Sequence, residues 1–178
     1  MYKVSKVSQS KRMKTKLSGR LTSIVDALPL TDDIRILEIG CGSGGMAREI
    51  SRRIGNGHIL AIDRSAKAIQ QAITGSQAEI ETGKLSFKRV AIERFELEPN
   101  EELFHIAVAI RVGALDGRHP EIEKQSLTNI AKALKEDGKL FIDRGTPLRE
   151  ISLDLYRENA GRQHNGQTPN KKGNEYKR

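Results

Sequence analysis

The chain has 178 residues, 37% of them hydrophobic and 30% charged, with a formal net charge of +8 at pH 7. This length suits a single domain with its own core, and no run approaches the roughly 18 consecutive apolar residues that a membrane-spanning helix needs. Cys41 is the only cysteine, which excludes an intrachain disulfide and a cysteine-cluster metal site, so we expect a reducing, cytoplasmic location and no bound metal.

The positive charge is concentrated at the two ends of the chain. The first 20 residues contain seven basic residues and no acidic one, residues 157–178 carry a net charge of +4, and residues 21–156 carry −3. No apolar stretch follows the basic N-terminal segment, so we do not expect a secretory signal. A basic arm can bind RNA, but only Tyr2 among these N-terminal charges offers a ring on which a base could stack.

These charge differences divide the chain into three segments. We expect a basic, flexible arm over residues 1–16 and a globular domain over residues 17–158. The polar remainder, residues 159–178, has the composition of a disordered tail.

The first half of the globular segment alternates between helical and strand patterns. Apolar spacing predicts a helix over 17–28, a strand over 34–39, a helix over 46–54, a strand over 58–62 and a helix over 65–72. Glycines after the second helix end it, and Ser65 can act as the N-cap of the third.

The second half continues the alternation. We expect strands over 85–90 and 104–110, a long helix that begins at Pro120 and is closed by Gly138, a strand over 139–143, and a last helix over 147–158. Strands that alternate with helices predict a parallel sheet covered on both faces, with right-handed crossovers. Ligands of such sheets bind beyond the carboxyl ends of the strands.

Four glycines occupy six positions between Gly40 and Gly45, at the carboxyl end of the first strand and just before a helix. Missing side chains let a ligand contact the backbone there. Asp63 ends the second strand, where a carboxylate can accept hydrogen bonds from ribose hydroxyls. The spacing Gly40-x-Gly42-x-x-Gly45 also satisfies the dinucleotide-binding pattern, with Arg64 placed for a 2′-phosphate.

The surrounding residues discriminate further. The pattern Glu38-x-Gly40-x-Gly42-x-Gly44 resembles the first motif of class I S-adenosylmethionine-dependent methyltransferases. The stretch Asp63-Arg64-Ser65, with Ile69 and Ala72 after it, resembles that family's second motif, and residues 127–140 are similar to its helix leading into the fifth strand. The resemblance covers about residues 17–145.

This resemblance implies a three-layer αβα, Rossmann-like methyltransferase fold whose mostly parallel sheet has about five strands in the order 3-2-1-4-5. It also implies S-adenosylmethionine as cofactor. The implied cofactor-binding residues are Glu38, which would support the glycine-rich segment or reach the ammonium group, the backbone of Gly40, Cys41, Gly42 and Gly44 around the methionine part, Asp63 at the ribose with Arg64 next to it, and Ala91 and Ile92 at the adenine.

Ala91 departs from the family's pattern, and Cys41 carries a thiol within the glycine-rich segment. Many family members have an aspartate where this chain has Ala91. The side chain of Ala91 cannot accept a hydrogen bond from the adenine amino group. Ile92 would then contact the adenine through its backbone, and Glu93 could substitute for the missing aspartate as acceptor. We interpret Cys41 as a small packing residue rather than a nucleophile.

The acceptor side of the site carries less signal. We expect it after the fourth strand, with the substrate-binding candidates Arg111, Asp116, Arg118 and His119. His119 is the candidate general base, needed only if the acceptor must lose a proton. A small-molecule acceptor is the favoured interpretation; an NAD(P)-dependent oxidoreductase, an RNA methyltransferase and a non-catalytic nucleotide-binding module remain alternatives.

The chain is short for the family that it resembles. We expect the fifth strand to form an exposed edge unless the last helix or another subunit covers it. A homodimer, or a partner that completes the acceptor site, therefore stays open.

Overall fold

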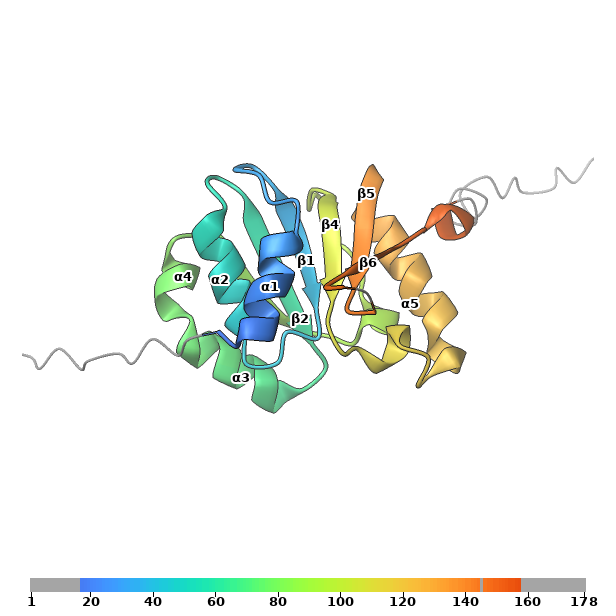
Figure 1. The fold of residues 1–178 in the computed structure, drawn as a ribbon, viewed down its shortest axis with the longest axis horizontal. Coiled ribbons are helices and arrows are strands. Elements are labelled where there is room, and N and C mark those ends of the chain that lie inside the picture. Colours follow the sequence, from blue (N-terminus) through green and yellow to red (C-terminus); the bar gives the residue numbers. More distant parts are fainter. Residues whose placement is uncertain (1–16, 145, 158–178) are drawn as a thin grey trace, which may run out of the picture.

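The computed structural model describes residues 17–144 and 146–157. The predicted arm (1–16) and tail (159–178) lie outside the described residues. A six-stranded sheet forms the centre of the molecule, in the order β3-β2-β1-β4-β5-β6 (Figure 1). Its strands are β1 (Arg35–Ile39), β2 (His58–Asp63), β3 (Leu85–Arg89), β4 (Phe104–Ala109), β5 (Leu134–Ile142) and β6 (Arg149–Ile151).

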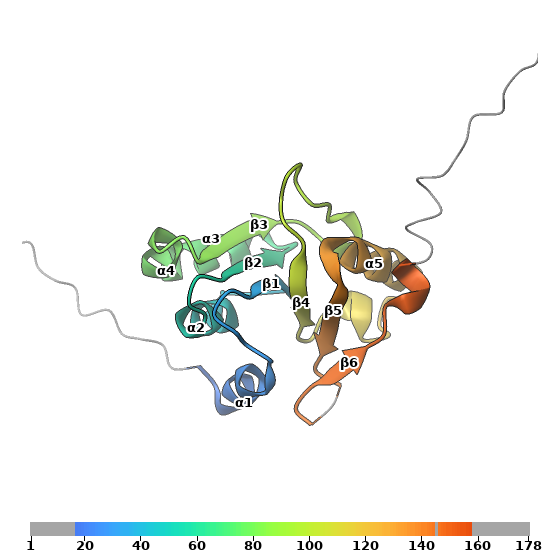
Figure 2. The same cartoon turned by 90° about the horizontal axis from the view of Figure 1, so that it is seen from above.

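Helices cover both faces of this sheet, as predicted. They are α1 (Gly19–Ala27), α2 (Gly45–Arg53), α3 (Ala66–Gly75), the short α4 (Gln77–Glu81) and α5 (Pro120–Ala133), with 3₁₀ turns η1 (Ile92–Arg94) and η2 (Gly113–Leu115). Figure 2 shows α1 and α2 on one side of the sheet and α5 on the other. None of the described helices is long and apolar enough to cross a membrane.

Side-chain alternation along the strands builds two separate cores. On β1, Ile36 packs in one core with α1, α2 and α3, whereas Leu37 packs in the other with α5 and η1. Successive strand residues point to opposite faces, and each face is apolar, so the inner strands must be covered twice. The three-layer α/β fold expected from the sequence is confirmed.

Strands β1 to β5 pair in parallel, and only β6 runs antiparallel to its neighbour β5. A parallel sheet places the carboxyl ends of β1, β2, β4 and β5 at one edge. The glycine-rich segment, the segment after β4 and the segment after β5 therefore meet at this edge, which lies at the bottom of Figure 1.

The prediction of a last helix over 147–158 was wrong for most of that segment. Residues 149–151 form β6, and only 154–157 are helical. The free edge of β5 explains the difference, because its unpaired backbone groups gain hydrogen bonds from an added strand. Glu150 lies opposite Phe141 in the register, and its carboxylate is 3.0 Å from Nζ of Lys139.

Two smaller differences concern helix ends and short helices. Helix α5 ends at Ala133 rather than near Gly138, because Leu134 already has extended backbone and pairs with Phe104 of β4. Helix α4 was not predicted. The other expected helices and strands occur within a few residues of their expected bounds, and Ser65 does cap α3 by accepting from the backbone N–H of Ala68.

Candidate active site

The glycine-rich segment between β1 and α2 is anchored to the end of β2. The backbone N–H groups of Gly40 and Cys41 both donate to the carbonyl of Ile62, at 2.8 and 3.0 Å. The N–H of Gly44 donates back to the carbonyl of Cys41. The segment, which we call the glycine loop (residues 40–44), is therefore a fixed turn and not a loose connection.

Gly40 and Gly42 are needed for different reasons. Both have left-handed backbone, with φ of +74° and +55°, which costs any residue with a Cβ. A Cβ on Gly40 would lie 2.8 Å from Cγ2 of Val112, whereas a Cβ on Gly42 would meet nothing within 4 Å. Gly40 thus allows the segment after β4 to approach, and Gly42 faces open space that a ligand can fill.

Asp63 connects the glycine loop to helix α3. Its Oδ2 accepts from the N–H of Gly42 at 2.9 Å, and its Oδ1 accepts from the N–H of Ser65 at 2.8 Å. Each carboxylate oxygen still has a second lone pair. Asp63 can therefore organise the loop and accept from a ribose at the same time, and the ribose contact stays a prediction.

Glu38 is a buried acid beneath the glycine loop, with 3% of its surface exposed. Burial raises its pKa to about 8, against the opposing effects of the Arg48 charge and a hydrogen bond from the backbone of Ala47. Its Oε2 has no hydrogen-bond partner in the described part of the chain. An unpaired buried acceptor is costly, so this oxygen is suited to a donor that arrives with a ligand.

Two cavities flank the glycine loop. The first, about 270 Å³, is lined by Ile39, Gly40, Ile62, Asp63, Arg64, Val90, Ala91, Ile92, Glu93, Arg111, Val112, Gly113, Ala114, Arg118, His119 and Ile122. The second, about 350 Å³, is lined by Ser18, Arg20, Leu21, Glu38, Gly40, Cys41, Gly42, Ser43, Gly45, Met46, Ile110 and Arg111. Only Gly40 and Arg111 line both, so they form the boundary between the two spaces.

The predicted cofactor-binding residues divide between these cavities. Asp63, Arg64, Ala91 and Ile92 line the first, and Glu38, Cys41 and Gly42 line the second, with Gly40 in both. Gly44 lines neither; a Cβ there would lie 2.9 Å from the ring of Phe87, so this glycine lets the ring pack closely, and its contact with the cofactor stays a prediction. Burial also raises the pKa of the Cys41 thiol, so the thiol stays protonated, consistent with a packing role.

The predicted substrate-binding residues follow β4. The guanidinium of Arg118 forms an ion pair with Asp116 and also donates to the carbonyl of Arg111. The hydrogen bonds from Arg118 keep the pKa of the Asp116 carboxyl below its usual range. Asp116 lines neither of these cavities and pairs with Arg118, so its contact with a substrate stays a prediction.

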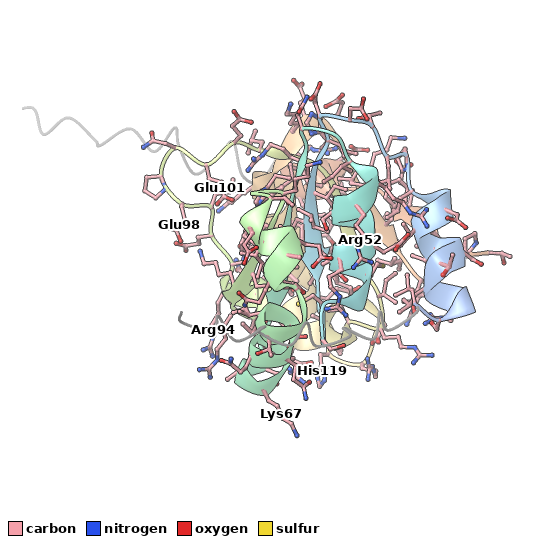
Figure 3. The ribbon with its side chains drawn as sticks, turned by 90° about the vertical axis from the view of Figure 1, so that its left-hand side faces the viewer. Arg52, Lys67, Arg94, Glu98, Glu101 and His119 are labelled. Carbon is pink, nitrogen blue, oxygen red and sulfur yellow. The ribbon has the colours of Figure 1, made fainter. Side chains whose placement is uncertain are left out.

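Arg111 and His119, the other two predicted substrate-binding residues, lie at the carboxyl edge of the sheet and line the first cavity. Within the described residues the guanidinium of Arg111 has no ion pair, while its backbone N–H donates to Asp143. His119 packs over Gly113 and lies 3.3 Å from Glu121. Figure 3 shows His119 at the lower end of the molecule.

Four residues at the site were not found from the sequence. Ser18 and Arg20, at the start of α1, line the second cavity. Asn129 is buried in α5 and donates to the carbonyl of Ile92 at 3.0 Å, which fixes the turn beside the first cavity. Asp143 binds both Arg20 and Arg111. For Asn129 the sequence offered one signal, a polar residue next to the apolar positions of a predicted helix. Its hydrogen bond to Ile92 depends on the tertiary structure.

No group of three or more His, Cys, Asp or Glu side chains suited to a metal ion occurs among the residues that the structure describes. The arrangement instead offers two polar-lined cavities joined at a glycine loop. One has a carboxylate at a strand end, and the other has a buried acid together with two arginines.

Comparison with known proteins identifies the kind of domain that contains this site. A family model described as a methyltransferase domain matches residues 36–138, which include the glycine loop, Asp63 and the whole segment after β4. A search of curated proteins found no match.

Solved structures share the fold at low sequence identity. An S-adenosylmethionine-dependent methyltransferase from Thiobacillus denitrificans, in complex with S-adenosyl-L-homocysteine, is 20% identical with a TM-score of 0.56, over 75% of this chain and 51% of that one. One from Geobacter sulfurreducens, also in that complex, is 20% identical with a TM-score of 0.55, over 69% and 46%. Coclaurine N-methyltransferase, bound to N-methylheliamine and SAH, is 19% identical with a TM-score of 0.57, over 68% and 34%. The chain thus spans about half or less of the length of these proteins.

Proposed function

The chain belongs to the class I S-adenosylmethionine-dependent methyltransferases, and on that premise we propose that it transfers a methyl group from S-adenosylmethionine to a small-molecule acceptor. One observation carries the proposal. Glu38, a buried acid whose Oε2 has no hydrogen-bond partner among the described residues, and Asp63, a carboxylate at the end of β2, line the two cavities that meet at the glycine loop.

The first cavity suits the adenosine part of the cofactor. Asp63 would accept from the ribose hydroxyls, and the Ala91–Ile92 segment would supply an apolar wall for the adenine. Ala91 has no acceptor for the adenine amino group, so we propose that Glu93, which lines the same cavity, takes that role.

The second cavity suits the methionine part. Glu38 offers its unpaired Oε2 to the ammonium group, and an ion pair with that group would repay the burial of the acid. Arg20 lines the same cavity, and the guanidinium N–H groups that Asp143 does not engage can donate to the carboxylate. Gly42 leaves its backbone accessible between these groups.

The residues present fit the chemistry of methyl transfer. Bound S-adenosylmethionine supplies an electrophilic methyl group on a positively charged sulfur. The protein's part is to hold donor and acceptor in line and to exclude water, which can supply most of the rate enhancement. His119 lines the first cavity and would serve as general base for an acceptor that must lose a proton.

We propose that the acceptor carries a carboxylate or another anionic group. Arg111 stands at the boundary of the two cavities, and its guanidinium forms no ion pair with the residues that the structure describes, whereas the guanidinium of Arg118 is paired with Asp116. A planar guanidinium binds such groups in bidentate geometry. Arg111 would therefore serve the acceptor, and Arg20 the methionine carboxylate.

Calorimetric titration of the full chain tests the function. S-adenosylhomocysteine and S-adenosylmethionine should bind, and NAD and NADP should not. At 100 times its dissociation constant a ligand adds about 2.7 kcal/mol to the free energy of unfolding, so the melting temperature should rise as well. Binding of NADP alone would replace the proposal with the oxidoreductase alternative. RNA binding that persists at physiological salt would favour the nucleic-acid alternative.

A further inference from the structure

Asp143, at the end of β5, holds two walls of the second cavity without lining it. Its side chain is 13% exposed. Oδ1 accepts from the backbone N–H of Arg111 at 3.1 Å, and Oδ2 pairs with the guanidinium of Arg20. One carboxylate therefore joins the first turn of α1 to the segment after β4.

Both partners need such a restraint. Arg111 has left-handed backbone, with φ of +58°, a conformation that a residue with a long side chain adopts only when its surroundings hold it there. Helix α1 packs on the sheet through Ile24 and Val25. It has an ion pair at each end: Arg20 with Asp143, and Asp26 with Arg53.

The two partners of Asp143 differ in the cavities that they line. Arg20 lines the second cavity only, whereas Arg111 lines both. The first turn of α1 lies at the same end of the sheet as the glycine loop (Figure 1). Movement of Arg20 would open the second cavity alone, and movement of the Arg111 backbone would alter both.

We propose that Asp143 is a positioning residue that shapes the second cavity for the methionine part of the cofactor, by docking α1 through Arg20 and by holding Arg111 in its left-handed conformation. The inference rests on the proposed function, because it assumes that the methionine part occupies this cavity. Asp143 itself would not touch the cofactor.

The two oxygens of Asp143 can be tested separately. Asparagine keeps a carbonyl oxygen for the Arg111 N–H, but its amide cannot form an ion pair with Arg20. Alanine removes both contacts. Asp143→Asn should therefore lose the docking of α1 through Arg20, and Arg20→Gln should lose both this docking and the donors that Arg20 offers to the cofactor. Asp143→Ala should have a larger effect than Asp143→Asn. Asp26→Asn is the matched control, because it removes the ion pair at the other end of α1, away from the cavity.

The experiment compares two probes on the full chain by calorimetry: S-adenosylhomocysteine, which has the amino-acid part, and adenosine, which lacks it. Asp143→Asn should weaken S-adenosylhomocysteine binding about tenfold, the size of one lost charge-assisted contact, and Arg20→Gln should weaken it at least as much. Both variants should leave adenosine binding unchanged. Asp143→Ala should weaken both probes. The Asp143→Asn, Arg20→Gln double variant should be no weaker than Arg20→Gln alone, because Asp143→Asn acts through Arg20.

Two results would overturn the inference. Unchanged S-adenosylhomocysteine affinity in Asp143→Asn would show that the ion pair does not shape the cavity. Equal losses for both probes in that variant would indicate a general structural effect. If Asp143→Ala does not fold, Asp143→Asn and Arg20→Gln still test the inference. Failure of the unchanged chain to bind S-adenosylhomocysteine would remove the proposed function, and this inference with it.

Discussion

The backbone N–H of Gly42 donates a 2.9 Å hydrogen bond to Oδ2 of Asp63, which joins the glycine loop to the end of β2. Asp63 also holds the first turn of α3 through Ser65. The residue predicted to bind the ribose is thus also the residue that shapes the loop.

Asp63→Ala should therefore weaken S-adenosylhomocysteine binding by more than its ribose contacts alone. We expect a loss of about 1.5–3 kcal/mol for each charge-assisted hydrogen bond removed, measured by calorimetry. Ser65→Ala is the control, since it removes the N-cap of α3, at about 1 kcal/mol of stability, and leaves the Asp63 carboxylate in place. Equal affinities in the two variants would mean that Asp63 serves only α3.

Gly40→Ala and Gly42→Ala should show that Gly40 is needed for packing of the protein and Gly42 for space that the ligand occupies. Both place a Cβ on left-handed backbone, at about 1–2 kcal/mol, but only the Gly40 variant also approaches Val112. Thermal unfolding should show the larger destabilisation for Gly40→Ala. S-adenosylhomocysteine binding should be lost in Gly42→Ala although the protein remains folded. Normal binding by the folded Gly42 variant would place the ligand elsewhere.

The stability of the ligand-free protein should fall as pH rises between about 4.5 and 8. The Glu38 carboxyl titrates near 4.5 when unfolded and near 8 when buried, so within this window the folded state binds the extra proton. The loss should approach roughly 1.4 kcal/mol per pH unit, measured by denaturant unfolding. Glu38→Gln cannot titrate and should lack this slope; the same slope in that variant would assign it to other groups.

Cofactor binding should show the opposite pH dependence. Glu38 must be ionised to pair with an ammonium group, so binding should release a proton and the affinity for S-adenosylhomocysteine should rise up to about pH 8. Calorimetry in buffers of different ionisation enthalpy measures the proton release. An affinity that does not change over this range, or changes equally in Glu38→Gln, would exclude Glu38 from the ammonium site.

Arg111→Gln should impair the use of anionic acceptors. Transfer of labelled methyl groups to a panel of carboxylic acids, each matched with its methyl ester or amide, should favour the acids in the unchanged chain and lose that preference in the variant. Arg118→Gln is the control, because Asp116 already engages that guanidinium. A preference for the neutral compounds in the unchanged chain would contradict the anionic acceptor.

The sequence by itself determined the alternation of helices and strands, the glycine loop and the carboxylate after β2. These features depend on residues close together in the chain, whose periodicity and backbone freedom are local properties. Gly42 and Asp63 could be placed at the site from the sequence because parallel strands bring their carboxyl ends to one edge, and Glu38 because its spacing from the glycines resembles the family's first motif.

Only the tertiary structure decided how this edge is divided and held. The formation of β6 depends on the free edge of β5 and not on the segment's own pattern. The contacts of Asp143 with Arg20 and Arg111, and of Asn129 with Ile92, join residues far apart in the chain. No spacing rule connects such partners, since packing of the helices on the sheet sets their distances. The partition of the site into two cavities with Gly40 and Arg111 between them therefore emerges only when the chain is folded.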